Sequence, residues 1–231
     1  MESPPPGHAG RRDVPSEEGF RTTVTAELAA QEALLARGEP AARVAVVRER
    51  AVSYGVRVSP AADYLRRARQ EGIEVAARSG GGTGILHLEN DLIWGVVLPR
   101  TDRRVGRDFV RAYARLGAAL VSVLGDEGRS ARWTEAPGLA EAYCPLSSRG
   151  EVLVVDDRIV GGAAQHATAK ALLHHGTLSV AIDRASVDRL FGLAPGGPST
   201  RLGGLAELGV RVPAPTLAAR LERAWRTELE P

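Results

Sequence analysis

Residues 78–87 read RSGGGTGILH, a glycine-rich turn that joins two stretches of β-forming sequence. Four of the five residues at 80–84 are glycines, so the backbone there can approach a ligand closely and direct its N–H groups at an anion. Arg78 adds a permanent cation whose planar fork of donors suits a carboxylate or a phosphate. The stretch has neither the Gly-Lys-Ser/Thr ending of a P-loop nor the following helix of a dinucleotide-binding turn. It therefore predicts either a flexible turn or a loop that holds an anionic group.

A second unusual stretch, residues 144–177, reads CPLSSRGEVLVVDDRIVGGAAQHATAKALLHHGT. It contains the only cysteine of the chain, Cys144, and a tract of small residues at 161–164. Small residues in a strand let a ligand or another backbone come close. A lone cysteine is by default an inert buried thiol. Cys144 could act as a nucleophile only if it lies in a pocket that a substrate can reach.

Three histidines of this stretch, His166, His174 and His175, raise the question of a metal site. Neighbouring residues of a strand point to opposite faces, so His174 and His175 cannot easily bind one ion. We therefore expect one hydrogen-bonded histidine in the core, one histidine on the surface, and no metal.

The segments around these stretches set the fold class. Strands are predicted at 44–47, 51–54, 73–77, 92–98, 152–155, 158–160 and 177–182, the first two as a pair joined by a charged turn. Helices are predicted at 23–36, 60–69, 106–124, 186–191 and 215–229. Because strands and helices do not alternate strictly, we expect an α/β domain whose mixed, mostly antiparallel sheet is flanked by helices. Residues 1–20 are predicted to be a disordered tail, and residues 21–231 the domain.

Composition argues against several classes of protein. The 231 residues are 44% hydrophobic and 25% charged with a net charge of +2, as in ordinary globular proteins. Basic and acidic residues are interspersed and aromatics are only 4%, so no nucleic-acid partner is predicted. No stretch is apolar for long enough to cross a bilayer, and residues 1–20 lack the apolar core of a signal peptide. A single cysteine allows no internal disulfide, so a cytoplasmic location without membrane attachment is predicted.

Three motifs, taken in order, resemble the lipoate–protein ligase and octanoyltransferase superfamily, which is related to biotin–protein ligases. They are Arg-Ser-Gly-Gly-Gly before a histidine at 78–87, Arg-Ile-Val-Gly-Gly-Ala-Ala-Gln at 158–165, and Leu-Leu-His-His-Gly-Thr at 172–177. The likeness spans about residues 25–190. It implies a biotin/lipoate protein ligase-like catalytic domain with 79–87 and 158–177 side by side around one pocket. The substrate-binding residues that it implies are Arg78, Ser79, Gly80, Gly81, Gly82, Thr83, His87, Gly161, Gly162, Ala163, His175, Gly176 and Thr177.

Two branches of this superfamily differ in their chemistry. ATP-dependent ligases activate lipoate as an acyl-adenylate, whereas the other branch keeps a cysteine that accepts the acyl group as a thioester. Cys144 precedes a Ser-Arg-x-Glu segment at 148–151, as in the cysteine branch. The resemblance implies an enzyme that moves a lipoyl or octanoyl group through Cys144 to a lysine of a lipoyl-domain or glycine-cleavage-type carrier protein, without a cofactor. The alternatives are a lipoate–protein ligase that uses ATP and magnesium, and a non-catalytic lipoate-binding homologue.

Arg158 departs from the family pattern, because relatives have a lysine immediately before the Ile-x-Gly of this motif. In relatives that lysine polarises the acyl carbonyl; arginine can also donate to an oxyanion but keeps its proton. Lys170, the only lysine of the chain, follows twelve residues later. The resemblance thus implies Cys144, Arg158 and Lys170 as catalytic candidates. Arg158 is expected to point into the pocket, or Lys170 to fill it instead.

Overall fold

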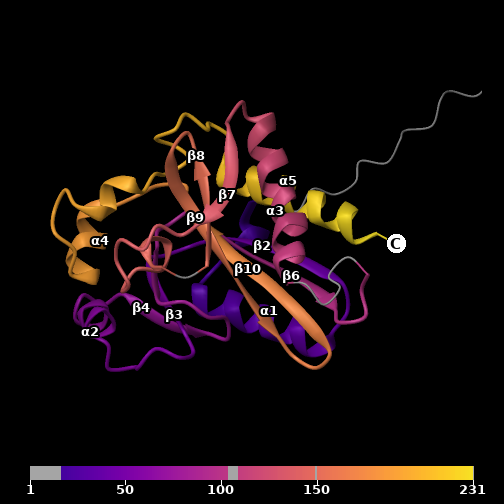
Figure 1. Ribbon diagram of the computed structural model, residues 1–231, viewed down its shortest axis with the longest axis horizontal. Coiled ribbons are helices and arrows are strands. Elements are labelled where there is room, and N and C mark those ends of the chain that lie inside the picture. The colour runs from indigo at the N-terminus through magenta and orange to yellow at the C-terminus, as the bar shows by residue number, and fades with distance from the viewer. Residues whose placement is uncertain (1–16, 104–108, 149, 231) are drawn as a thin grey trace, which may run out of the picture.

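Two β-sheets form the framework of the computed structural model, which describes residues 17–103, 109–148 and 150–230 (Figure 1). The larger sheet has seven strands in the order β1-β2-β6-β10-β9-β8-β7, and the smaller has the order β4-β3-β5. The strands are β1 (Arg21–Thr22), β2 (Ala41–Val47), β3 (Ala51–Gly55), β4 (Glu74–Arg78), β5 (Gly84–His87), β6 (Leu92–Pro99), β7 (Ala131–Glu135), β8 (Glu151–Val155), β9 (Arg158–Ala167) and β10 (Ala171–Leu178). The helices are α1 (Val24–Arg37), α2 (Asp63–Gln70), α3 (Phe109–Asp126), α4 (Arg184–Phe191) and α5 (Ala214–Leu229), with 3₁₀ turns η1 (Glu17–Phe20), η2 (Cys144–Leu146) and η3 (Pro198–Arg201).

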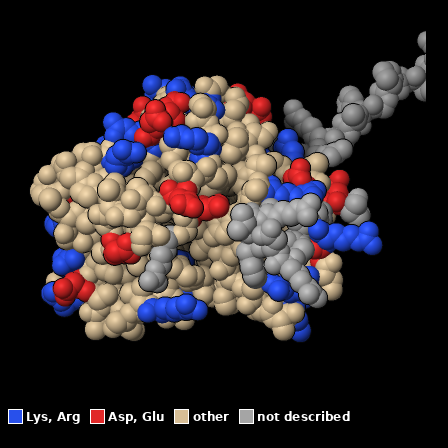
Figure 2. All heavy atoms as spheres, in the orientation of Figure 1, with Lys and Arg blue, Asp and Glu red and all other residues tan. Residues whose placement is uncertain are grey.

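Strand directions in both sheets confirm the predicted fold class. In the large sheet β1 pairs with β2 in parallel, and every other pairing of the described strands is antiparallel. In the small sheet β3 pairs with β4 in parallel and with β5 in antiparallel orientation. The result is a mixed, mostly antiparallel α/β domain. On the face that Figure 2 shows, basic and acidic side chains are interspersed.

Helices cover both faces of the large sheet, which explains the unbroken apolar run of β6. Leu92, Trp94 and other even-numbered residues of β6 belong to the core that α3 and α5 close. Ile93 and Val97, on the opposite face, pack with residues of α1. Because side chains alternate along a strand, a strand buried on both faces must be apolar at every position.

The small sheet is covered by α2 and α4, which meet through aromatic side chains. The rings of Tyr64 on α2 and Phe191 on α4 lie 5.0 Å apart, and Tyr143 lies 4.7 Å from Phe191. These three rings pack with Leu146 of η2 in one buried cluster. The cluster therefore anchors η2, and with it Cys144, against the small sheet.

Several elements differ from the prediction. The strand predicted at 177–182 is β10, which spans Ala171–Leu178, β9 continues to Ala167, and β7 was not predicted. The predicted pairing of 44–47 with 51–54 is wrong, because β2 and β3 belong to different sheets and residues 48–50 carry the chain from one to the other. The predicted tail ends too late, because η1 begins at Glu17 and Phe20 is buried in the core. Residues 1–16, and positions 106–108 of the predicted long helix, lie outside the described residues. Within the described ranges, no helix has the length and apolar character to span a membrane.

Candidate functional site

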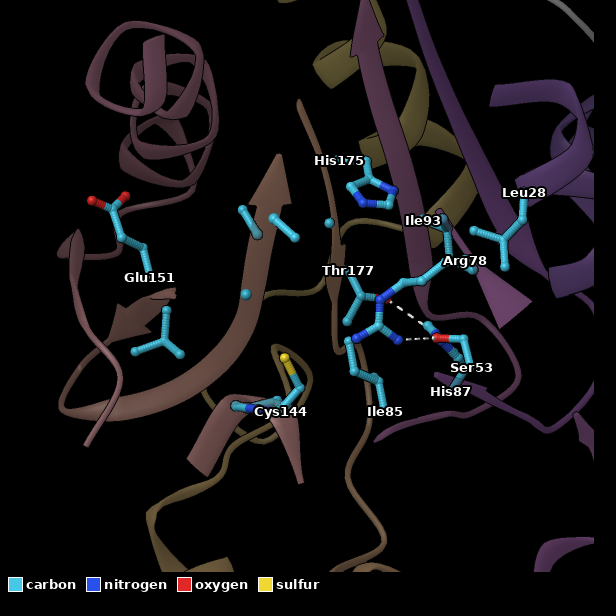
Figure 3. A pocket seen from close by; sticks show the side chains of 16 residues that line it. Leu28, Ser53, Arg78, Ile85, His87, Ile93, Cys144, Glu151, His175 and Thr177 are labelled. Carbon is cyan, nitrogen blue, oxygen red and sulfur yellow. Dashed lines mark hydrogen bonds between the residues drawn. The ribbon is translucent and has the colours of Figure 1, made fainter. Parts of the chain in front are cut away.

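A pocket lies where the two sheets meet, and both motif-bearing stretches line it (Figure 3). It holds about 530 Å³ of empty space, its open mouth included. Of the residues predicted to bind substrate or react, those that line it are Arg78, His87, Cys144, Gly162, Ala163, His175, Gly176 and Thr177.

The glycine-rich loop, residues 79–83, is held by the guanidinium of Arg78. Nε and Nη2 of Arg78 donate to the Gly81 carbonyl at 3.3 and 3.2 Å, and Nη2 also donates to the Thr83 carbonyl at 2.8 Å. The backbone N–H groups of residues 79–83 have no acceptor within the described part of the chain. Arg78 thus occupies the loop carbonyls, and the loop N–H groups are left without a partner among the described residues. Ser79, Gly80, Gly81, Gly82 and Thr83, which were predicted to bind substrate, adjoin the pocket but do not line it.

Arg78 is buried, and it has fewer donors left for a ligand than an arginine whose guanidinium is free to bind an anion. Most of its donors are taken by the loop and by Ser53, whose Oγ accepts from Nη1 at 3.0 Å. Burial lowers the pKa of Arg78, and the nearby Cys144 side chain opposes this shift. The arginine therefore organises the site and places a positive charge beside the cysteine.

Cys144 is brought to this loop by η2. Residues just before it are tied to β5, because Gly84 N–H donates to the Ala142 carbonyl at 3.2 Å and Gly84 forms a β-bridge with Tyr143. A Cβ on Gly82 would lie 2.6 Å from Cys144 Sγ and 3.0 Å from Arg78 Nη2. The half-buried free thiol is thus packed directly on the loop at a position where only glycine leaves room.

A buried hydrogen-bonded chain fixes the protonation of His87. Arg78 donates to Ser53, and Ser53 Oγ lies 2.7 Å from His87 Nε2. Thr177 Oγ1 lies 3.1 Å from His87 Nδ1 and donates to the Leu92 carbonyl at 3.2 Å. Because the Thr177 hydroxyl donates its hydrogen to the Leu92 carbonyl, His87 must donate from Nδ1 to Thr177 and accept at Nε2 from Ser53. Burial and the charge of Arg78 lower the pKa of His87 to about 3, so it is a neutral structural link.

His174 and His175 point to opposite faces of β10, as expected, but both are buried. His174 packs 4.9 Å from the Trp94 ring and 4.7 Å from that of Tyr113, whereas His175 bonds Gln31 and faces the pocket. The prediction of a surface histidine is wrong because β10 is a central strand with both faces covered. Among the described residues, no three His, Cys, Asp or Glu side chains could together hold a metal ion.

The small residues of β9 and β10 let these strands approach closely. A Cβ on Gly176 would lie 2.3 Å from the Gly162 carbonyl oxygen and 2.5 Å from the Trp94 side chain. A Cβ on Gly161 would lie 2.2 Å from the Thr177 carbonyl oxygen. Gly161 therefore lets β9 and β10 lie close together, whereas Gly162 and Gly176 line the pocket.

Arg158 and Lys170 lie outside the pocket, so both predictions about their position are wrong. Arg158 is exposed, and its Nη1 donates to the Thr200 carbonyl. It precedes the pocket residue Gly162 by four positions, and an extended strand rises about 3.3 Å per residue, which separates the two by about 13 Å. Lys170 is exposed on the turn between β9 and β10. The described lining of the pocket therefore contains no lysine.

Three pocket features were missed from the sequence. Ser53 joins Arg78 to His87, and Gln31 of α1 supports His175. Glu151, the first residue of β8, lines the pocket, and burial together with Glu135 on the neighbouring strand raises its pKa. The signal available for Gln31 was a polar residue at a core-facing position of a predicted helix. Glu151 belongs to the Ser-Arg-x-Glu segment at 148–151.

The buried histidines predict a steep loss of stability in acid. Burial lowers the pKa of His87, His174 and His175 to about 3, and raises that of Asp91 to about 7. Near pH 5 the unfolded chain binds three protons on the histidines, whereas the folded chain binds one on Asp91. With two protons more on the unfolded chain, the free energy of unfolding should fall by about 2.7 kcal/mol per pH unit of acidification near pH 5, and by less per unit closer to pH 6.5. Urea unfolding at pH 7.5 and 5.5 measures this, and equal stability at both would contradict it.

Comparison with known proteins places this site in a family. Residues 23–210 match the model of the lipoyl protein ligase A/B catalytic domain. A search of curated protein sequences finds no match.

Solved structures share the fold at low sequence identity. The chain is similar to lipoate-protein ligase A bound with ATP, with 21% identity, 90% of this chain and 83% of that chain covered, and a TM-score of 0.73. It is similar to a bipartite lipoate protein ligase from Thermoplasma acidophilum, studied with its E2 lipoyl domain, with 21% identity, coverage of 90% and 81%, and a TM-score of 0.69. A putative lipoate protein ligase from T. acidophilum with bound lipoic acid has 21% identity, coverage of 90% and 83%, and a TM-score of 0.68.

Proposed function

The chain belongs to the lipoyl protein ligase A/B catalytic-domain family, and from that membership we propose that it moves a lipoyl or octanoyl group to a lysine of a carrier protein through a thioester on Cys144. Family membership gives protein lipoylation as the process. The observation that carries the thioester mechanism is the contact of Cys144 Sγ with the glycine-rich loop beside Arg78. Lipoyl-domain or glycine-cleavage-type carriers are the proposed donor and acceptor.

In the first half-reaction, the sulfur of Cys144 attacks the carbonyl carbon of the acyl group on the donor carrier. A C–S bond forms, and the donor's amine or thiol leaves with a proton. The carbonyl oxygen becomes an oxyanion on the way. The guanidinium of Arg78, which lines the pocket, and the unpaired N–H groups of the adjoining loop at 79–83 are the groups proposed to stabilise it.

In the second half-reaction, the amine of the acceptor lysine attacks the thioester carbonyl. The amide C–N bond forms, the C–S bond breaks, and Cys144 regains its proton. The apolar side chains of Leu28, Ile85, Ile93 and Val152 line the same pocket and suit the hydrocarbon part of an octanoyl or lipoyl chain.

The donor set of the pocket favours this mechanism over ATP-dependent activation. Among its described lining residues, Glu151 is the one carboxylate and Arg78 the one permanent cation. Most donors of Arg78 already serve the loop and Ser53. Magnesium with ATP is usually held by one or two carboxylates and by further contacts to the phosphates. Glu151 could supply one such carboxylate, but the committed donors of Arg78 leave few side-chain contacts for the phosphates.

Intact-mass measurement after incubation with an octanoyl- or lipoyl-carrier donor tests the proposal. We expect one acyl group on the chain without ATP, released by hydroxylamine as a thioester is, and passed on when an unmodified lipoyl domain is added. Acylation that requires ATP and free lipoate would identify a ligase instead. Absence of transfer in both cases would identify a lipoate-binding protein.

A further inference from the structure

Glu151 is the one carboxylate among the described residues that line the pocket, and it stands at the pocket mouth. Exposure locates this mouth, because lining residues such as Leu28 are buried whereas Cys144 and Glu151 are half-buried. Glu151 begins β8 and lies directly opposite Ala163, a half-buried residue of the pocket wall on β9. In Figure 3 its carboxylate lies across the pocket from Arg78 and is turned away from it. Cys144 and Glu151 thus share one opening to solvent.

No group in the described part of the chain neutralises the Glu151 carboxylate. It has neither a hydrogen bond nor an ion pair among the described residues. Glu135, which lies opposite it on β7, carries the same charge. Burial and this neighbour raise the pKa of Glu151, which makes its carboxylate a stronger proton acceptor than a free one. An unpaired carboxylate in a pocket, beside a like charge, is expected to meet a cation when substrate is bound.

The acceptor of the proposed reaction brings such a cation. A lysine amine has an ordinary pKa of about 10.4, so at neutral pH it arrives as an ammonium ion. Only the neutral amine can attack a thioester. Arg78, the cation beside Cys144, repels an ammonium ion, and much of the inner lining is apolar. The amine must therefore lose a proton between the mouth and the sulfur.

We propose that Glu151 receives the acceptor lysine at the pocket mouth, pairs with its ammonium group and takes the proton that the amine must lose. This deepens the proposed function, on which it rests for the thioester and the acceptor. An N–H bond of the ammonium breaks and an O–H bond forms on Glu151. The neutral amine then forms the C–N bond with the acyl carbon, its second proton passes to Cys144 as the C–S bond breaks, and Glu151 releases its proton to water. The carboxylate thus acts in the second half-reaction and has no part in the first.

The rate at which a preformed octanoyl thioester is consumed, followed by intact mass, tests this role. Glu151→Gln keeps the shape of the side chain and removes its charge and its affinity for a proton. We expect the full-length variant to form the thioester within about twofold of the wild-type rate, and to transfer the group to an unmodified lipoyl domain about a hundredfold more slowly. Cleavage by hydroxylamine, which is uncharged at neutral pH, should stay within about twofold. Wild-type transfer by the variant, an equal loss with both nucleophiles, or an equal loss of thioester formation overturns the proposal.

Glu135→Gln is the matched control, because Glu135 lies opposite Glu151 in the strand register, is exposed and does not line the pocket. It removes the same charge from the neighbouring strand and should keep transfer to the lipoyl domain within about twofold of wild type. A hundredfold loss in Glu135→Gln would mean that the negative charge of this rim acts at a distance, and would overturn a specific role of Glu151. Thermal unfolding midpoints of both variants check that each one folds.

Binding distinguishes failure of this role from failure of the proposed function. Should the wild-type chain form no thioester, the proposed function fails, and calorimetry with the unmodified lipoyl domain still decides the role of Glu151. Glu151→Gln should then raise the Kd of the lipoyl domain about tenfold, and should leave unchanged the Kd of a lipoyl domain whose acceptor lysine is replaced by methionine. An equal change in both Kd values, or no change in either, overturns the pairing of Glu151 with the acceptor lysine.

Discussion

Replacing Cys144 by serine is expected to reduce acyl transfer on the order of a thousandfold or more, and to leave the fold intact. A serine hydroxyl is nearly isosteric with the thiol but is far less nucleophilic without an adjacent base. Of the two imidazoles that line the pocket, His87 is committed to Ser53 and Thr177, and His175 bonds Gln31 and packs on Gly80. Among the described residues, no hydrogen bond links the side chain at position 144 to a general base.

The measurement is the rate at which an octanoyl-carrier donor acylates a lipoyl domain, together with the intact mass of the variant. Cys144→Ser should show no thioester adduct and should retain the thermal unfolding midpoint within a few degrees. Transfer by Cys144→Ser at the wild-type rate would contradict the thioester mechanism.

Arg158 and Lys170, the two cationic residues that the sequence predicted to lie at the acyl group, provide matched controls. Arg158→Ala and Lys170→Ala should keep transfer within about twofold of wild type, because both side chains are exposed outside the pocket. A hundredfold loss in either would mean that a carrier protein or a rearrangement brings that residue to the reacting group.

The fold and half of the pocket lining could be predicted because they depend on local patterns. The glycine run at 80–82, the small residues at 161–164 and the His-His-Gly-Thr end of β10 mark places where other groups approach the backbone closely. The structure brings Arg78 and His87 of the first stretch together with residues of the other two in one pocket. Such constraints can be recognised in the sequence, since only small side chains fit at those positions.

Long-range placement could not be predicted in the same way. Position along β9 moves Arg158 away from Gly162, and a motif match carries no information on which end of a strand faces the pocket. The partners of His175 also escaped prediction, because Gln31 lies 144 positions away in the chain. Both depend on which strands of the two sheets meet, and that is decided by tertiary packing.

Alanine at position 82 is expected to reduce acyl transfer about a hundredfold, whereas alanine at position 81 should change it by less than about twofold. Gly82 has φ +87°, a left-handed conformation that costs a residue with a side chain about 1–2 kcal/mol. Its new methyl group would lie 2.6 Å from Cys144 Sγ and 3.0 Å from Arg78 Nη2. Cys144, the loop or the guanidinium must then shift, and a displacement of about 1 Å at a nucleophile costs on the order of a hundredfold in rate.

Gly81 is the matched control because a Cβ built there meets no atom within 4 Å. Both variants add one methyl group to the same loop, so any general stiffening of the loop affects them alike. Transfer rates, with thermal unfolding as a check on folding, compare the two. Equal rates for Gly81→Ala and Gly82→Ala would mean that the loop does not pack on Cys144 in solution. A selective loss in Gly82→Ala, with an unfolding midpoint close to wild type, would place the reacting sulfur against this glycine.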